Sequence, residues 1–194
     1  MGSTTAATAL LLVRVVLGIT MMLHGYNHWR GGGRIPGTAR WFSGLGLRHG
    51  VLQAWMSVVT ELGAGFLLIA GLLTSLACAA VISVMLIAGV LAHRKNGFFV
   101  FKDGYEYVLL ISVVALSLAT TGPGRFSVDN AAGISVTGWA GGGIALGVAV
   151  AATAGMLATF YRPGPKQPAD AAEATEATEL AETNEAADTA EPAF

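Results

Sequence analysis

Charged residues are scarce in this chain. They make up 12% of its 194 residues, about half the share found in ordinary soluble domains. Hydrophobic residues account for 54%, and the mean hydropathy is +0.62. Acids are nearly missing from residues 1–166, where eleven bases stand against four acids, and the other eight acids fall between Asp170 and Glu191. This composition excludes an ordinary soluble domain and indicates a membrane protein.

Cysteine is also nearly absent, because Cys78 is the single one and lies in an apolar run. One cysteine excludes an internal disulfide and the paired-cysteine motifs of redox and haem sites. We interpret Cys78 as a small buried apolar residue. Thiol or electron chemistry would therefore need a cofactor, a partner or a substrate. The sequence predicts no metal site and no nucleic-acid partner.

Apolar runs of helical length are abundant. They are continuous and not alternating, which favours transmembrane helices over a membrane barrel. We predict an all-α membrane protein, an antiparallel bundle of four core transmembrane helices plus a fifth. The predicted spans are Thr8–His24, Leu52–Gly71, Ser75–Ala92, Tyr105–Thr121 and Trp139–Tyr161.

Bases are concentrated in alternate connections between these spans. Nine bases, in the first and third connections and after the fifth span, fall on one side, and Arg125 is alone on the other. The positive-inside rule then predicts a multi-pass plasma-membrane protein with the N-terminus outside and the C-terminus in the cytoplasm. In the long first connection, Trp41, Phe42 and Leu45 predict a short amphipathic segment on the inner membrane surface.

The domain organisation follows from the spans. We predict a four-helix membrane core over 1–129, a connecting loop and fifth helix over 130–162, and an acidic, disordered cytoplasmic tail over 163–194. The tail acids recur every third residue and form no helical stripe. The fifth span carries small residues at a spacing of four, which suits close helix packing within the bundle or between copies of the chain. These residues are Gly143, Gly147, Ala151 and Gly155.

Two charged residues lie well inside the predicted spans, away from their ends: Arg14 in the first and Glu61 in the second. Each would be an uncompensated charge in lipid, and counting helical rise places both near the middle of the membrane. We therefore predict a buried Arg14–Glu61 ion pair. It would fix the helix register, and Glu61 could in addition transfer protons or bind substrate.

A second polar cluster is predicted at the inner rim of the membrane. His24 ends the first span, His93 follows the third and Glu106 begins the fourth, with Tyr105 beside it. Imidazole next to carboxylate suits proton exchange with a quinone, so these four residues are the candidate quinone site. The two histidines could also ligate a b-type haem, which is less favoured because both lie at helix ends. The plainer alternative is polar side chains reaching the headgroups.

Several blocks of the sequence resemble the DoxX family of small membrane proteins. They are RVVLGITMMLHGYNHW, TARWFSGLGL, ELGAGFLLIAGLLTSLA, HRKNGFF and GYEYVLLISVVALSLATTGPGRFSVD, and they span roughly Leu10 to Asp129. The matching motif positions include Arg14, Gly18, His24, Gly25, Glu61, Gly97, Glu106, Gly122, Gly124 and Arg125. The fifth helix and the acidic tail look like additions to the four-helix family core.

The resemblance implies a plasma-membrane protein, in some members a subunit of a thiosulfate:quinone oxidoreductase, with other relatives linked to oxidative and thiol stress. The sequence thus predicts a DoxX-like protein that supports quinone- or sulfur-linked redox chemistry or oxidative-stress defence in a membrane complex. Whether the chain is itself an enzyme stays open, with His24, Glu106 and Glu61 as candidate catalytic residues. The alternative is a non-catalytic scaffold or assembly factor. A transporter is disfavoured because no internal repeat is evident.

Overall fold

The computed structural model describes residues 3–134 and 136–163, and within them the regular secondary structure is helical. This confirms the predicted all-α bundle. The long helices are α1 (Thr4–Arg30), α3 (Gly50–Ala70), α4 (Thr74–Ala88), α5 (Glu106–Thr121) and α7 (Gly138–Phe160). The short ones are α2 (Arg34–Gly44), α6 (Val128–Ala131), the π-helical turn η1 (Gly89–His93), and the 3₁₀ turns η2 (Arg94–Asn96) and η3 (Val100–Lys102).

Four of these segments are long and apolar enough to cross a membrane: α1, α3, α7 and the 23-residue run Thr74–Asn96 that begins with α4. The fourth predicted span forms α5, which has only 16 residues. The predicted fifth span matches α7 within one residue at each end. The first span is longer than predicted, because α1 continues through the polar residues up to Arg30.

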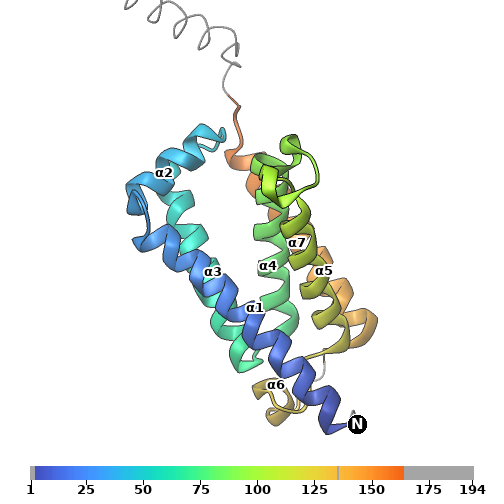
Figure 1. Cartoon of the computed structure of the whole chain (residues 1–194). Helices are drawn as coiled ribbons and strands as arrows, with labels where there is room; N and C mark the ends of the chain where they lie inside the picture. Colours follow the sequence, from blue (N-terminus) through green and yellow to red (C-terminus); the bar gives the residue numbers. More distant parts are fainter. Residues whose placement is uncertain (1–2, 135, 164–194) are drawn as a thin grey trace, which may run out of the picture. The chain divides into compact units, whose positions relative to one another are not determined.

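Within residues 1–162, α4 holds the central position of the bundle (Figure 1). It packs against α3, α5 and α7, whereas α1 packs mainly along α3. The α3–α4 turn and α6 lie at one end of this unit, and α2 lies at the opposite end. We call these the α6 end and the α2 end. The predicted acidic tail from residue 163 onward lies almost wholly outside the described residues.

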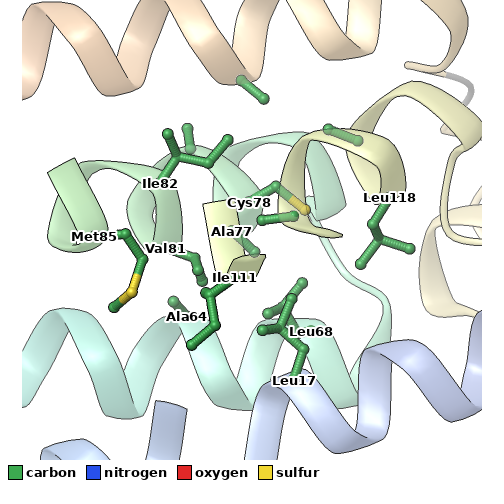
Figure 2. Packing of buried hydrophobic residues seen from close by; sticks show 14 of the residues in the cluster. Leu17, Ala64, Leu68, Ala77, Cys78, Val81, Ile82, Met85, Ile111 and Leu118 are labelled. Atoms are coloured by element: carbon green, nitrogen blue, oxygen red, sulfur yellow. The ribbon is translucent and has the colours of Figure 1, made fainter. Parts of the chain in front are cut away.

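The central position of α4 follows from its composition. Small and medium apolar side chains occupy every side of α4, so the helix can be surrounded by neighbours. Figure 2 shows its core, where Leu17 of α1, Leu68 of α3 and Ile111 of α5 belong to the same buried cluster as α4. Cys78 is fully buried in this cluster, in agreement with its interpretation as a packing residue.

Glycine fixes how α1 crosses α3. A Cβ on Gly18 would lie 2.7 Å from the carbonyl oxygen of Gly65, and a Cβ on Gly65 would lie 2.6 Å from that of Gly18. The two backbones therefore touch where no side chain fits. Seven residues further along α1, Gly25 faces Glu61 with similarly little space. These contacts set the register of the two helices.

The predicted amphipathic segment forms α2. Its residues Ala39 and Phe42 are buried, whereas Trp41 is 46% exposed. Phe42 belongs to a second buried cluster with Leu47 and Ala54, against which the end of α7 packs. Hydrogen bonds from the backbone N–H of Arg48 to Phe160 and of Arg162 to Gly46 fasten α7 to the α2 end.

The fifth helix is built into the bundle. Gly141, Ala145, Ala149 and Thr153 of α7 are buried against its neighbours. The predicted small-residue stripe faces elsewhere, since Gly143, Gly147 and Gly155 have open space around them. The stripe is thus available to other molecules and does not pack within the bundle.

Candidate functional site

Glu61 is the buried carboxyl group in the middle of α3, with 2% exposure. Its Oε1 accepts a hydrogen bond from the Ser57 hydroxyl one helical turn earlier, and the same oxygen lies 3.7 Å from Nε2 of His28 on α1. Its Oε2 has no hydrogen-bond partner among the described residues. A buried polar atom without a partner is costly, so such atoms in native proteins usually have a functional explanation.

Glu61 lines a cavity of about 410 Å³. Figure 1 shows α3 and α4 diverging from their turn toward the α2 end, and the cavity is lined by residues of both helices. Trp41 and Phe42 of α2 and Leu45 directly after it line the cavity, and α7 supplies Val148, Ala152 and Met156. Its size is in the range of small-molecule sites.

Most of the cavity lining is apolar, and its polar side chains are few and grouped. Gln53, Ser57 and Glu61 follow one another at intervals of four along α3, which places them on one face, with Thr60 beside them and His28 adjacent from α1. Across the cavity, Ser83 of α4 is the polar side chain, and its hydroxyl lies 3.1 Å from that of Thr153 on α7. An apolar chamber with a few convergent polar groups is the usual form of a site for a mostly apolar ligand.

The predicted Arg14–Glu61 ion pair is wrong. The Arg14 guanidinium is fully buried, but it donates hydrogen bonds to the carbonyl oxygens of Leu68 and Phe126 near the α6 end. Glu61 lies further along α3 toward the α2 end, where it faces Gly25 of α1. The depth count failed because the close contact of Gly18 with Gly65 sets a register in which Arg14 meets the last turn of α3, not its middle.

Arg14 instead belongs to a structural cluster with Asp129 of α6. The Asp129 carboxylate accepts hydrogen bonds from the backbone N–H groups of Leu73 and Thr74, at 2.8 and 2.9 Å, and from the Thr74 hydroxyl at 2.7 Å. It therefore caps the N-terminus of α4, where a carboxylate is favoured. Its negative charge also attracts the Arg14 guanidinium. Sequence reasoning did not assign Asp129 a role.

The predicted cluster of His24, His93, Glu106 and Tyr105 is not formed as one site. The His24 ring lies 6.2 Å from that of Tyr107. His93 bonds the backbone oxygen of Asp103, and the Glu106 carboxylate accepts the N–H of Val100. The Tyr105 ring lies against Phe98. His93, Glu106 and Tyr105 therefore build the connection before α5, and none of the four lines the cavity.

Depth alone does not say which face of a helix a residue occupies. His28 is one helical turn beyond His24 and is the histidine that reaches Glu61. The signal in the sequence was the polar stripe of Gln53, Ser57 and Glu61 in an otherwise apolar helix.

Comparison with known proteins agrees with the membrane bundle. The family model described as DoxX matches residues 9–94. The chain contains a DoxX segment within a membrane bundle. The match starts beside the predicted Leu10 and ends short of Asp129, so it covers α1 to the end of η1, with α5, α6 and α7 beyond it. No curated protein and no solved structure matches the chain.

Within the DoxX-like protein, the matched segment supplies the polar side chains of the cavity, which are His28, Gln53, Ser57, Thr60, Glu61 and Ser83. It also supplies most of the apolar wall, and α7, outside the match, adds Val148, Ala152 and Met156. The cavity is therefore built mainly from the matched segment.

Proposed function

We propose that the DoxX-like protein binds a quinone or quinol in the cavity and exchanges a proton with it through Glu61 and His28. The observation that carries the proposal is the unpartnered Oε2 of a buried carboxyl group on an otherwise apolar cavity. A quinone ring with a hydrophobic tail matches an apolar chamber that has hydrogen-bonding groups at a few points. The candidate proton-exchanging residues thus become His28 and Glu61.

The arrangement suits proton exchange for a geometric reason. Ser57 and His28 both lie at Oε1 of Glu61, which fixes the carboxyl group, and Oε2 has no hydrogen-bond partner among the described residues. A carboxylate in this position accepts the proton of a quinol hydroxyl, and a protonated carboxyl donates to a quinone oxygen. His28 lies beside the carboxyl group and can pass the proton onward.

The opposite wall offers a second polar contact. The Thr153 hydroxyl lies 3.4 Å from the backbone oxygen of Ser83, to which it donates, and the two hydroxyls lie 3.1 Å apart. If Thr153 donates to this carbonyl, the Ser83 hydroxyl donates to Thr153 and keeps acceptor capacity toward the cavity. A quinol, which has a hydroxyl at each end of its ring, can then donate to Glu61 and to Ser83.

The electrons of a quinol need an acceptor in a cofactor, a partner or a substrate, because Cys78 is buried in the core and offers no thiol to the cavity. We therefore infer that the chain works as a subunit of a redox complex, in which quinone- or sulfur-linked chemistry or oxidative-stress defence is completed by a partner. The open face of α7, with Gly143, Gly147 and Ala151, is the surface we infer for a partner helix or a second copy.

Quenching of tryptophan fluorescence by an added short-chain quinone tests the proposal, since Trp41 lines the cavity. Glu61→Gln and His28→Ala should each weaken quinone binding about tenfold, the usual cost of losing a hydrogen bond to a charged group. Glu106→Gln is the matched control, because this carboxyl group lies outside the cavity, and it should bind normally. A Trp41→Phe variant identifies the quenched residue.

Unchanged quinone binding in Glu61→Gln and His28→Ala, or no binding at all, would remove the proposal. Purification with a stoichiometric protein partner and no retained quinone would then favour the scaffold or assembly factor, whose contact surface would be the same open face of α7.

We also infer a plasma-membrane location with the α2 end in the cytoplasm. Eight bases of the described chain belong to segments at this end, whereas Arg125 lies next to α6. The eight are Arg30, Arg34, Arg40, Arg48, Arg94, Lys95, Lys102 and Arg162. Topology reporters fused at Ala6 and after Lys166 should report opposite sides of the membrane, with Lys166 inside. Reports from the same side would contradict this orientation.

A further inference from the structure

The connection between η2 and α5 presents a group of exposed apolar side chains. In this aromatic loop (residues 97–105), Phe101 is 76% exposed, Phe99 52% and Phe98 43%. Their rings lie against one another, with centroids 5.2 Å apart for Phe99 and Phe101 and 5.5 Å apart for Phe98 and Phe99. Contiguous exposed apolar groups of this kind mark a surface that another phase or molecule covers.

The aromatic loop is held in shape by hydrogen bonds. The backbone N–H of Tyr105 donates to Gly97 at 3.0 Å, and that of Glu106 donates to Phe98 at 2.9 Å. The Glu106 carboxylate accepts the N–H of Val100 at 3.0 Å. The aromatic rings are therefore presented outward by a closed backbone. This gives Glu106 a structural task that the sequence did not reveal.

The level of the aromatic loop along the bundle is fixed by His93. Its Nδ1 lies 2.8 Å from the backbone oxygen of Asp103, so the loop sits beside the last turns of the Thr74–Asn96 span. The following helix α5 has 16 residues, or about 24 Å, which is shorter than the hydrocarbon core of about 30 Å. The helix α5 alone is thus too short to cross the hydrocarbon core, and the aromatic loop lies directly before its first turn.

Cations flank the aromatic loop. Arg94, Lys95 and Lys102 are all exposed, against one exposed acid, Asp103. The loop also shares its end of the bundle with the other bases of the α2 end. Aromatic rings with adjacent cations are the combination that suits the boundary between acyl chains and anionic headgroups.

We propose that the aromatic loop is an interfacial anchor for an anionic lipid leaflet. Phe98, Phe99 and Phe101 enter the boundary of the acyl region. Arg94, Lys95 and Lys102 bind lipid phosphates and other anionic headgroup oxygens. The occupant is a lipid surface and not a protein, because the loop completes a span that is too short. This anchor is independent of quinone binding in the cavity.

The single buried cysteine makes the test direct. In a Cys78→Ala background, a fluorophore attached to Phe101→Cys reports on the aromatic loop of the full chain, reconstituted in vesicles. Brominated phosphatidylcholine and brominated phosphatidylglycerol serve as quenchers in parallel samples. A label on Ala132→Cys, an exposed position in the connection after α6, is the matched control.

We expect both brominated lipids to quench the label at position 101, with phosphatidylglycerol the stronger quencher. Combined Arg94→Gln, Lys95→Gln and Lys102→Gln should abolish the preference for phosphatidylglycerol, since each cation near an anionic surface contributes about fivefold. The label at position 132 should show no such preference in either background.

Three results would overturn the proposal. The first is a label at position 101 that neither lipid quenches. The second is a phosphatidylglycerol preference that survives the triple substitution. The third is a label at position 101 that is not quenched in lipid alone but becomes shielded when a membrane-protein extract is added. This result would assign the surface to a protein partner.

Discussion

A double-mutant cycle tests whether Arg14 and Glu61 are independent, as the structure requires. Arg14 donates to the carbonyl of Leu68, which lies seven residues beyond Glu61 on α3, and seven residues of helix span about 10 Å. The two side chains share no hydrogen-bond partner among the described residues. Substitutions this far apart add within about 0.5 kcal/mol. We therefore expect additive effects of Arg14→Leu and Glu61→Leu on the free energy of unfolding.

The two single substitutions should differ in size. Arg14→Leu removes the side-chain donor to the carbonyl oxygens of Leu68 and Phe126 and a fully buried positive charge close to the cap of α4, at a cost of about 3 kcal/mol or more. Glu61→Leu removes a carboxyl group with one unpartnered oxygen, so it should cost less than about 1 kcal/mol or stabilise the protein. A small loss or a gain of stability on substitution is what we expect for a residue that is retained for function although it lowers stability.

Arg14 and Asp129 should be coupled, in contrast. Asp129→Ala removes the cap of α4 and the charge facing Arg14, so the double variant Arg14→Leu/Asp129→Ala should be milder than the sum by about 1 kcal/mol or more. Unfolding of the purified protein by sodium dodecyl sulfate, followed by circular dichroism, measures all of these values. A coupling between Arg14 and Glu61 above about 1 kcal/mol would refute the register described above.

Two further predictions concern packing. Gly18→Ala should destabilise the protein by about 1–3 kcal/mol because its Cβ meets the backbone of α3. Gly143→Ala on the open face of α7 should be neutral or slightly stabilising. Equal effects of the two substitutions in thermal unfolding would contradict the α1–α3 contact. Cys78 should resist maleimide labelling in the folded protein and react only after denaturation, as mass spectrometry can show, and rapid labelling of the native protein would argue against the α4 core.

The fold could be read from the sequence because hydrophobicity along the chain decides it. Long uninterrupted apolar runs must form helices in lipid, since each backbone polar group needs a partner within its own segment. The position of α7 and the short helix α2 followed from the same reasoning. Helix ends were harder to predict, as α1 shows, because a helix that packs on a neighbour continues through polar residues.

The contacts within the site could not be predicted, because they depend on how helices far apart in the sequence pack together. Counting residues gave the depth of Arg14, His24 and Glu61, but partners also require the crossing point and rotation of each helix. Those were decided by the contact of Gly18 with Gly65, which joins residues far apart in the chain. By itself the sequence determined that the buried charges need partners. Only tertiary packing decided that Arg14 bonds to the carbonyl oxygens of Leu68 and Phe126 and that Glu61 lies beside His28 at a cavity. The physical reason is that close packing of small residues fixes the register of the helices.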